Sequence, residues 1–408
     1  MSLLSIRSKI KIPSDWEMVP IGKVLISSQY GTSNGNSETG VPVVGMKNLQ
    51  DGKVNFNDLP FVSLDEEERK RLILHNGDIL LNRTNSYDLV GKIGFVENAC
   101  EAVFASYLIR LEMDKTKSDP KFVAMWLSSF WADQMIKKIA TRAVSQANVN
   151  PTEFKKFCLI PLPPLPEQKA IADLLSTWDE AIEKTERLIQ AKEKWFKGLT
   201  QNLISKRCDS WPHIKSKKIF DTITEKNFPD EELLSVTQDR GVIPRSMLEG
   251  RVMSPNGTTA NYKLIKRGDF AISLRSFQGG IEYSNYQGII SPAYTVLRPK
   301  IELNNDFYRL FFKSYIFIEK HLNLAVIGIR DGKQISIPDF LSIKIPVPPL
   351  EEQKEITETL SIFQQEIDLL KQLSEKYKTQ KRGLMQKILT GEWRVKPEII
   401  KKYEGEQK

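Results

Sequence analysis

A long segment occurs twice in this chain, and this repeat constrains the fold more than any other sequence feature. Residues 160–204 begin IPLPPLPEQKAIADLLS, and residues 345–389 begin IPVPPLEEQKEITETLS. At a constant offset of 185, without a gap, the two copies share 16 of 45 residues. Prolines impose an extended start on each copy. After Pro166 in the first copy and Pro349 in the second, neither copy contains another proline. Each copy can therefore form one uninterrupted helix.

Apolar residues in both copies recur at three- and four-residue spacing, which is typical of one face of a helix. Ile171, Leu175 and Ile182 begin this pattern in the first copy, and Ile356, Leu360 and Ile367 repeat it in the second. At 1.5 Å per residue each helix would be about 55 Å long, more than one small domain covers. We call these helices the rods and predict that they pair as an antiparallel coiled coil. Ordinary core helices are the alternative.

The segments before the rods also resemble each other, though more weakly. Gly77-Asp78 and Gly268-Asp269 each precede an apolar run and then a polar stretch with arginine. Short β-rich runs bounded by Gly, Asn and Asp predict α+β domains with a twisted sheet. We predict a tandem repeat with pseudo-two-fold symmetry. Its parts are the first globular domain (1–153), the first rod (154–208), the second globular domain (209–339), and the second rod with its tail (340–408).

Each globular domain carries two polar stretches at matching positions. Arginine offers a planar fork of donors that fits guanine or phosphate, and Asn and Gln fit the edge of adenine. Solvated loops and a DNA-contacting surface are both compatible with such stretches. The candidate DNA-contacting residues are Arg83, Thr84, Asn85, Ser86, Arg142, Ser145 and Gln146 in the first domain, and Arg275, Ser276, Gln278, Arg330, Lys333 and Gln334 in the second.

Motifs for enzymatic chemistry are weak. The sequence has neither G-x-G-x-x-G nor G-x-x-x-x-G-K-[ST]. Ser291-Pro292-Ala293-Tyr294 has alanine where an amino-methyltransferase loop has a second proline. Pro338-Asp339 with Glu352-Gln353-Lys354 matches a nuclease spacing only because the glutamate and lysine belong to the duplicated start of the rod. His75, His213 and His321 lie in unrelated contexts without ligand spacing, which predicts structural roles.

Composition indicates the cellular compartment and the classes of partner that the protein can have. Cys100, Cys158 and Cys208 have no short spacing, which favours a reduced cytoplasm. No apolar run approaches the roughly 20 residues that span a bilayer, so we expect no membrane partner. The net charge of +8 permits a nucleic-acid partner without requiring one.

The duplicated IPLPPLPEQK and IPVPPLEEQK segments, each followed by a long helix, resemble the specificity (S) subunits of type I restriction–modification enzymes. Gly77-Asp78, the stretch from Arg83 to Ser86 with Leu89-Val90-Gly91-Lys92, and Gln-x-Asn-hydrophobic-x-Pro at 146–151 add to this resemblance. The second copy departs at Gly279-Gly280, which stand where the first has Tyr87-Asp88.

This resemblance implies a non-catalytic subunit in which each globular domain reads one half of a split, asymmetric site in double-stranded DNA. It adds Lys92 to the candidate DNA contacts. It further implies that the rods set the distance between half-sites and dock two methylation (M) subunits, which restriction (R) subunits then join. The chain itself would bind no cofactor, with S-adenosylmethionine, ATP and Mg on the partner subunits. A fused methyltransferase or nuclease, and a protein adaptor with two globular ends, remain the alternatives.

Overall fold

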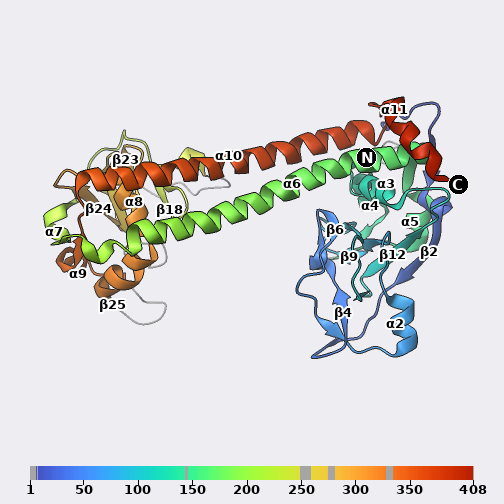
Figure 1. The fold of residues 1–408 in the computed structure, drawn as a ribbon, viewed down its shortest axis with the longest axis horizontal. Helices are drawn as coiled ribbons and strands as arrows, with labels where there is room; N and C mark the ends of the chain where they lie inside the picture. The colour runs from blue at the N-terminus through green and yellow to red at the C-terminus, as the bar shows by residue number, and fades with distance from the viewer. Residues whose placement is uncertain are drawn as a thin grey trace. The chain divides into compact units, whose positions relative to one another are not determined.

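The computed structural model describes residue 6 and residues 8–142, 146–248, 259–273, 281–327 and 334–407 (Figure 1). Its contacts divide the chain into two compact units. The first unit comprises Met1–Lys184 and Leu373–Lys408, and the second comprises Thr185–Gln372. The rods are α6 (Leu165–Thr200) and α10 (Leu350–Ile388), 36 and 39 residues long, and they appear green and red in Figure 1. The predicted α+β fold with two long helices is confirmed, whereas the predicted domain boundaries stay a prediction.

The first unit is built on a mixed six-stranded sheet. Its strand order is β2-β12-β8-β10-β6-β5, with β10 parallel to β6 and the other neighbours antiparallel. The bounds are β2 (Leu25–Tyr30), β12 (Leu108–Met113), β8 (Ile79–Asn82), β10 (Ile93–Phe95), β6 (Gly52–Val54) and β5 (Leu49–Gln50).

The first unit also contains smaller sheets. A four-stranded sheet has the order β11-β4-β7-β3, with β11 (Val103–Phe104), β4 (Val41–Val44), β7 (Phe61–Val62) and β3 (Asn36–Ser37). β1 (Glu17–Pro20) pairs with β15 (Leu159–Leu162), the strand that leads into the first rod.

Several short helices of the first unit precede the first rod. They are α2 (Glu66–Leu72), α3 (Pro120–Leu127), α4 (Phe130–Ile139) and α5 (Pro151–Phe157). Phe122 and Trp126 of α3 are fully buried in a cluster that also holds Ile171 of α6 and Ile388 of α10. The core of this unit therefore includes one end of each rod.

The second unit repeats this arrangement, but its largest sheet has four strands instead of six. A four-stranded antiparallel sheet has the order β17-β24-β21-β22, with β17 (Phe220–Ile223), β24 (Tyr294–Pro299), β21 (Phe270–Ser273) and β22 (Ile281–Tyr283). β16 (His213–Lys215) pairs with β27 (Lys344–Pro346), the strand that leads into the second rod. Further strand pairs include β18 (Leu234–Thr237) with β19 (Gly241–Pro244), and β20 (Lys263–Ile265) with β23 (Gly288–Ile290).

Aromatic rings fill the core of the second unit. The helices beside its sheets are α7 (Ser216–Ile219), α8 (Asn305–Lys313) and α9 (Ile337–Ser342). Phe307, Tyr308, Phe311 and Phe312 of α8 are all fully buried and contact one another edge-on, tilted or stacked. Contacts of this kind add to the free energy gained from burying so much apolar surface.

In the first unit the start of α6 packs against the end of α10, so the two helices run in opposite directions. The rings of Trp178 and Tyr377 meet edge-on, with centroids 5.9 Å apart. Arg394, just past α10, binds Glu167 at the start of α6 through its Nε and Nη2 atoms, 2.8 and 2.9 Å from the carboxylate oxygens. Glu167 is buried and also accepts a hydrogen bond from Trp16 Nε1.

In the second unit the end of α6 packs against the start of α10. The rings of Trp195 and Phe363 lie 4.2 Å apart, and Lys192 Nζ lies 2.8 Å from Glu366 Oε2. Arg207 Nη1 lies 3.4 Å from Glu352 Oε1. Glu352 occupies the position in the second copy that Glu167 occupies in the first. The predicted antiparallel pairing is thus confirmed separately in each unit.

A buried glutamine fixes the start of each rod. Gln168 accepts a hydrogen bond from the backbone N–H of Asp119 (2.8 Å) and donates to the carbonyl of Pro163 (2.8 Å). Asp119 is the N-cap residue of α3. The same amide thus closes the proline turn and orders the start of the neighbouring helix.

The second unit contains the same arrangement at the repeat offset. Gln353 accepts from the backbone N–H of Asn304, the N-cap of α8, at 2.9 Å and donates to the carbonyl of Pro348 at 2.8 Å. Both glutamine side chains are buried. This duplicated bonding explains in physical terms why the glutamine occurs in both copies.

The Gly-Asp pairs also have a structural role. Gly77 and Gly268 adopt φ values of +97° and +95°, which favour glycine. Each following aspartate accepts a hydrogen bond from the backbone N–H three residues earlier, at 2.9 Å in both cases. Asp269 also binds Arg298 through two hydrogen bonds, of 2.9 and 2.8 Å. This motif therefore shapes the turn before the central strand in each unit.

We predict that Gln168→Leu destabilises the first unit by about 2–4 kcal/mol, because a buried donor and a buried acceptor lose their partner. Gln190→Leu, at an exposed position of the same helix, should change the stability by less than about 0.5 kcal/mol. Urea denaturation followed by circular dichroism measures both. Equal midpoints for the two variants would contradict this role of Gln168.

Candidate nucleic-acid interface

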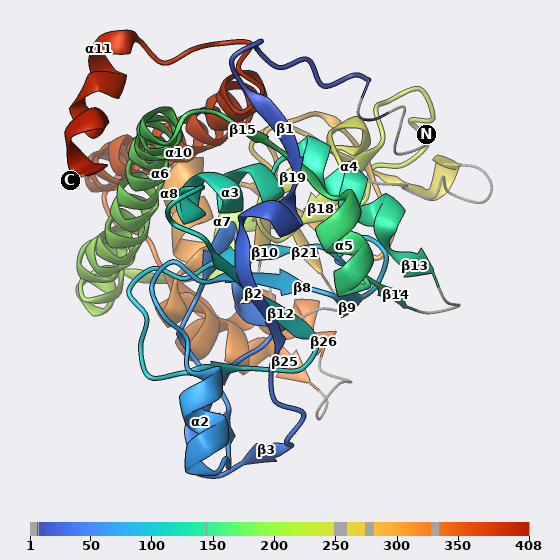
Figure 2. The same cartoon turned by 90° about the vertical axis from the view of Figure 1, so that its right-hand side faces the viewer.

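The structure brings the two polar stretches of the first domain together in one small antiparallel sheet. β9 (Thr84–Asn85) pairs with β14 (Ala147–Asn148), which pairs with β13 (Thr141–Arg142), and Figure 2 shows these three strands side by side. Segments more than 55 residues apart in the sequence therefore form one surface.

Arg83 precedes β9 and stacks on an aromatic ring. Its guanidinium carbon lies 4.6 Å from the ring centroid of Tyr30, the last residue of β2. A guanidinium over a tyrosine ring is held by electrostatic attraction while the edge of its fork can still bind a ligand. Within the described part of the chain, the buried Nε of Arg83 has no hydrogen-bond partner. The ring thus holds a half-buried arginine whose Nε faces inward.

Polar side chains surround Arg83 because β14 and its continuation alternate between buried and exposed residues. Ala147 and Val149 are buried, whereas Gln146, Asn148 and Asn150 are exposed. Successive side chains of a strand point to opposite faces, so these three share one face. A hollow of about 400 Å³ lies here, and its lining is Tyr30, Arg83, Thr84, Thr141, Gln146, Asn148, Val149, Asn150 and Pro151.

Asn85, one of the predicted residues of this stretch, already has internal partners. Asn85 Oδ1 accepts from the backbone N–H of Ser86 at 2.8 Å, and Asn85 Nδ2 lies 2.9 Å from Met46 Sδ. The side chain of Asn85 is therefore committed to shaping the turn, whereas Ser86 is exposed. Asn150, which we had not proposed as a candidate contact, caps α5 through Thr152 N at 2.8 Å.

Lys92 lies apart from this hollow. It is exposed and lines a separate depression of about 440 Å³ together with the carboxylates of Asp51, Asp88 and Asp133. Three nearby acids weaken the attraction of this lysine for phosphate. The structure thus groups Arg83, Thr84 and Gln146 but not Lys92.

Most candidates of the second domain lie outside the described residues. These are Arg275, Ser276, Gln278, Arg330 and Lys333. Ser145 of the first domain also lies outside the described residues. Gln334 is described as part of β26 (Gln334–Ile335), which pairs with β25 (Val326–Ile327) as β14 pairs with β13 in the first unit. Arg142 is likewise described only as part of its strand.

We did not predict Tyr30 and Asn148 as DNA contacts from the sequence, although both line the hollow. Tyr30 lies more than 50 residues before Arg83, and nothing in the spacing links the two. The alternation of polar and apolar residues from Gln146 to Asn150 does carry a signal, since it predicts that Asn148 shares a face with Gln146.

The nuclease-like spacing does not form a catalytic cluster. Glu352 binds Arg207, and Lys354 binds Glu351 at 2.8 Å. Asp339 lies in the first turn of α9, capped by Ser336. These residues thus serve local structure.

The predicted structural roles of the three histidines stay a prediction, but two of them lie close together in the structure. His213 and His321 lie next to each other with ring centroids 5.8 Å apart, and Cys208 lies beside them. Burial raises the pKa of the Cys208 thiol to about 11 and lowers the pKa of His321. Their sequence separation of more than 100 residues hid this proximity.

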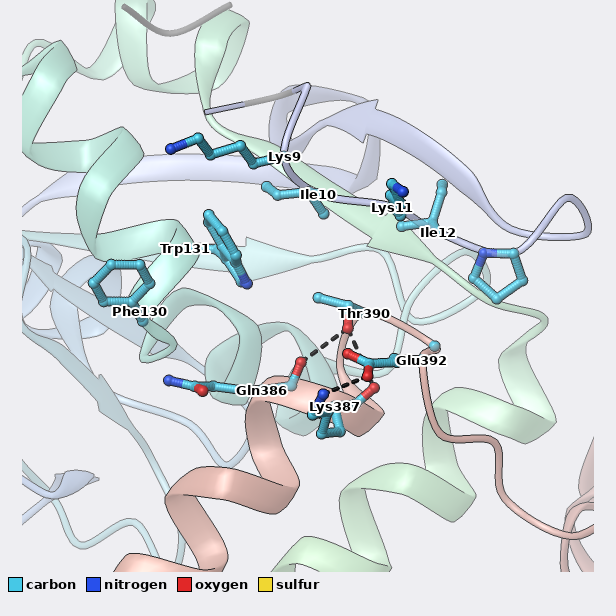
Figure 3. A pocket seen from close by; sticks show the side chains of 12 residues that line it. Lys9, Ile10, Lys11, Ile12, Phe130, Trp131, Gln386, Lys387, Thr390 and Glu392 are labelled. Atoms are coloured by element: carbon cyan, nitrogen blue, oxygen red, sulfur yellow. Dashed lines mark hydrogen bonds and ion pairs between the residues drawn. The ribbon is translucent and has the colours of Figure 1, made fainter. Parts of the chain in front are cut away.

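A further pocket of about 550 Å³ opens in the first unit where α10 ends (Figure 3). Residues 9–13, Phe130 and Trp131 line it opposite Gln386, Lys387 and residues 390–392. Thr390 Oγ1 donates to the backbone carbonyls of Gln386 and Lys387, at 2.8 and 3.2 Å. The residues that line this pocket include one glutamine and three lysines, but neither arginine nor asparagine. We therefore take the surface around β9 as the candidate interface.

Comparison with known proteins gives a family for this chain. A family model described as the type I restriction modification DNA specificity domain matches residues 13–193 and again residues 212–378. Each match runs from a globular segment into its rod, as the internal repeat requires.

Curated relatives match along nearly the whole chain. The putative type I restriction enzyme MjaX specificity subunit of Methanocaldococcus jannaschii is 28% identical over 414 residues, with 95% of each chain covered. The MjaVIII specificity subunit of the same organism is 26% identical over 426 residues, again with 95% of each covered. The EcoKI specificity subunit of Escherichia coli is 26% identical over 191 residues, 45% of this chain and 40% of that protein.

Solved structures share the fold at low identity. The type I restriction–modification S subunit from M. genitalium has a TM-score of 0.56 at 18% identity, covering 92% of this chain and 96% of that one. A structure from work on complex assembly and conformational transition of the type I R-M system has a TM-score of 0.58 at 17% identity, covering 94% and 100%.

In the described residues, no helix is long and apolar enough to cross a membrane. The duplicated fold and the two family matches lead to one conclusion: this chain belongs to the type I restriction modification DNA specificity family, as a non-catalytic specificity subunit that recognises its DNA target with two domains.

Proposed function

We propose that the surface around β9 reads one half of a split DNA site and that the corresponding surface of the second domain reads the other half. The observation that carries this proposal is the half-buried arginine stacked on Tyr30 beside polar side chains that line the same hollow. Arginine can bind guanine O6 and N7 through two hydrogen bonds, and glutamine or asparagine can do the same with adenine.

The first domain supplies each of these groups. Arg83 offers the fork, and Gln146 and Asn148 are exposed amides on the same small sheet. Their anchoring on paired strands limits the conformational entropy lost on binding. For the second domain, Arg275 and its neighbours remain candidates from the sequence repeat.

We further propose that two methylation subunits dock on the rods, that restriction subunits join this complex, and that the rods set the distance between the half-sites. Assembly with other subunits is expected of a specificity subunit, and exposed apolar residues on the rods support this place for it. In the second unit Leu188 and Trp195 of α6 are 44% and 49% exposed, and Ile362 and Leu369 of α10 are 64% and 65% exposed. Members of each pair are seven residues apart, so each pair lies along one helix face.

S-adenosylmethionine, ATP and Mg would then bind the partner subunits and not this chain. The lack of both glycine-rich phosphate-binding motifs in the sequence supports this assignment. Labelled S-adenosylmethionine should accordingly be retained by the assembled complex and not by the isolated chain.

Arg83→Ala should weaken binding to the recognised DNA by about 1–3 kcal/mol and relax the preference at one base pair, because a two-bond contact to a base is lost. The site is first read by comparing host methylomes with and without this gene. Fluorescence anisotropy at several salt concentrations then measures binding. Arg71→Ala, an exposed arginine of α2 in the same unit, is the matched control for charge.

Two outcomes would contradict the assignment of Arg83. An equal loss of affinity for all DNA sequences would make it a phosphate contact. Unchanged affinity and preference would remove it from the interface.

Ile362→Asp with Leu369→Asp should release at least one methylation subunit, because burying two new charges opposes docking. Gln365→Asp with Gln372→Asp adds similar charge to exposed positions of the same helix, also seven residues apart, and should leave the assembly intact. Mass photometry of the purified complex counts the subunits. Retention of two methylation subunits by the first variant would refute docking on this face.

A further inference from the structure

A cysteine and two histidines from three separate segments of the second unit converge at one point. Cys208 begins η4 (Cys208–Ser210), just past the first rod, His213 begins β16, and His321 ends η7 (Phe317–His321). One potential ligand atom from each residue lies within 4.8 Å of the other two. Cys208 is buried and the histidines are partly buried.

Backbone carbonyls orient both imidazole rings. His213 Nδ1 lies 2.8 Å from the carbonyl of Trp211, and His321 Nδ1 lies 3.0 Å from the carbonyl of Lys344. A carbonyl only accepts, so Nδ1 must carry the hydrogen in each ring, and each neutral ring keeps the lone pair on Nε2. A histidine that ligates a metal is usually held by such a bond from its other nitrogen.

We propose that Cys208, His213 and His321 form a zinc site. A thiolate with two imidazoles suits this metal, which binds sulfur at about 2.3 Å and nitrogen at about 2.0–2.1 Å in a tetrahedron. Those bond lengths place sulfur and nitrogen about 3.6 Å apart, and Cys208 Sγ lies 3.7 Å from His321 Nε2. A water molecule would complete the coordination.

The fold does not require histidine at positions 213 and 321, because the first unit has other residues at the corresponding positions. Trp16 and Trp211 are equivalent, since each donates its backbone N–H to the residue three positions earlier, Pro13 and Cys208, at 3.1 and 3.3 Å. By this alignment Met18 occupies the place of His213 in the first unit. At the repeat offset of 185, Ile136 occupies the place of His321. The first unit thus has two apolar residues where the second has imidazoles.

The metal would tie together three segments around the strand that leads into the second rod. His213 pairs with Pro346 of β27, and His321 bonds to Lys344 of the same strand. Cys208 belongs to the turn that leaves the first rod. Zinc would therefore stabilise the junction of the second domain with both rods, since a metal that binds only the folded state stabilises that state.

Titration of the chelator-treated full chain with Co²⁺ tests the site directly. We expect a thiolate-to-cobalt charge-transfer band that saturates at about one metal per chain, and Zn²⁺ should displace it. Cys208→Ser should abolish the band, and His213→Gln should weaken cobalt binding at least tenfold. Zinc should raise the thermal midpoint of the unaltered chain but not that of Cys208→Ser.

Cys100→Ser and His75→Gln are the matched controls, because both residues are exposed in the other unit, and they should leave the cobalt spectrum unchanged. Circular dichroism checks that each variant is folded. No charge-transfer band in the unaltered chain, or the same band in folded Cys208→Ser, would overturn the proposal and leave a simple thiol–imidazole hydrogen bond.

Discussion

At the start of each rod, one buried glutamine amide closes a proline turn and accepts the backbone N–H of the residue that caps a neighbouring helix. Gln168 does this in the first unit and Gln353 in the second. Buried backbone groups are costly without partners, so each amide couples the direction of the rod to the packing of its own globular part. Each unit also has an ion pair at the start of its rod, Arg394 with Glu167 in the first unit and Arg207 with Glu352 in the second. The antiparallel pairing of the rods and the placement of both cores depend on these duplicated contacts.

Sequence periodicity predicted the rods well because their packing is local and repeated. Apolar residues on one face and the absence of internal proline specify a long helix regardless of what surrounds it. The resulting helices, 36 and 39 residues long, agree with this prediction. The turns were recognisable for the same reason, since Gly77 and Gly268 supply φ values that other residues rarely adopt.

The candidate interface was only partly predictable, because it depends on contacts between distant segments. Arg83 and Gln146 were identified from their residue types, yet the strand pairing that joins them through β9 and β14 leaves no local pattern. Tyr30 under Arg83 belongs to another sheet and gave no signal. The cluster of Cys208, His213 and His321 was missed because its third member, His321, lies more than 100 residues after the other two.

The central claim is that the two rods pair antiparallel, and disulfide trapping within the first unit tests it most directly. Ile171 and Ile388 pack in one buried cluster of the first unit, whereas Ile356 packs in a cluster of the second. In a Cys100→Ser background, Ile171→Cys with Ile388→Cys should form an intramolecular disulfide under mild oxidation, detected by peptide mapping. Ile171→Cys with Ile356→Cys should not. A disulfide in the second pair and none in the first would contradict the antiparallel arrangement.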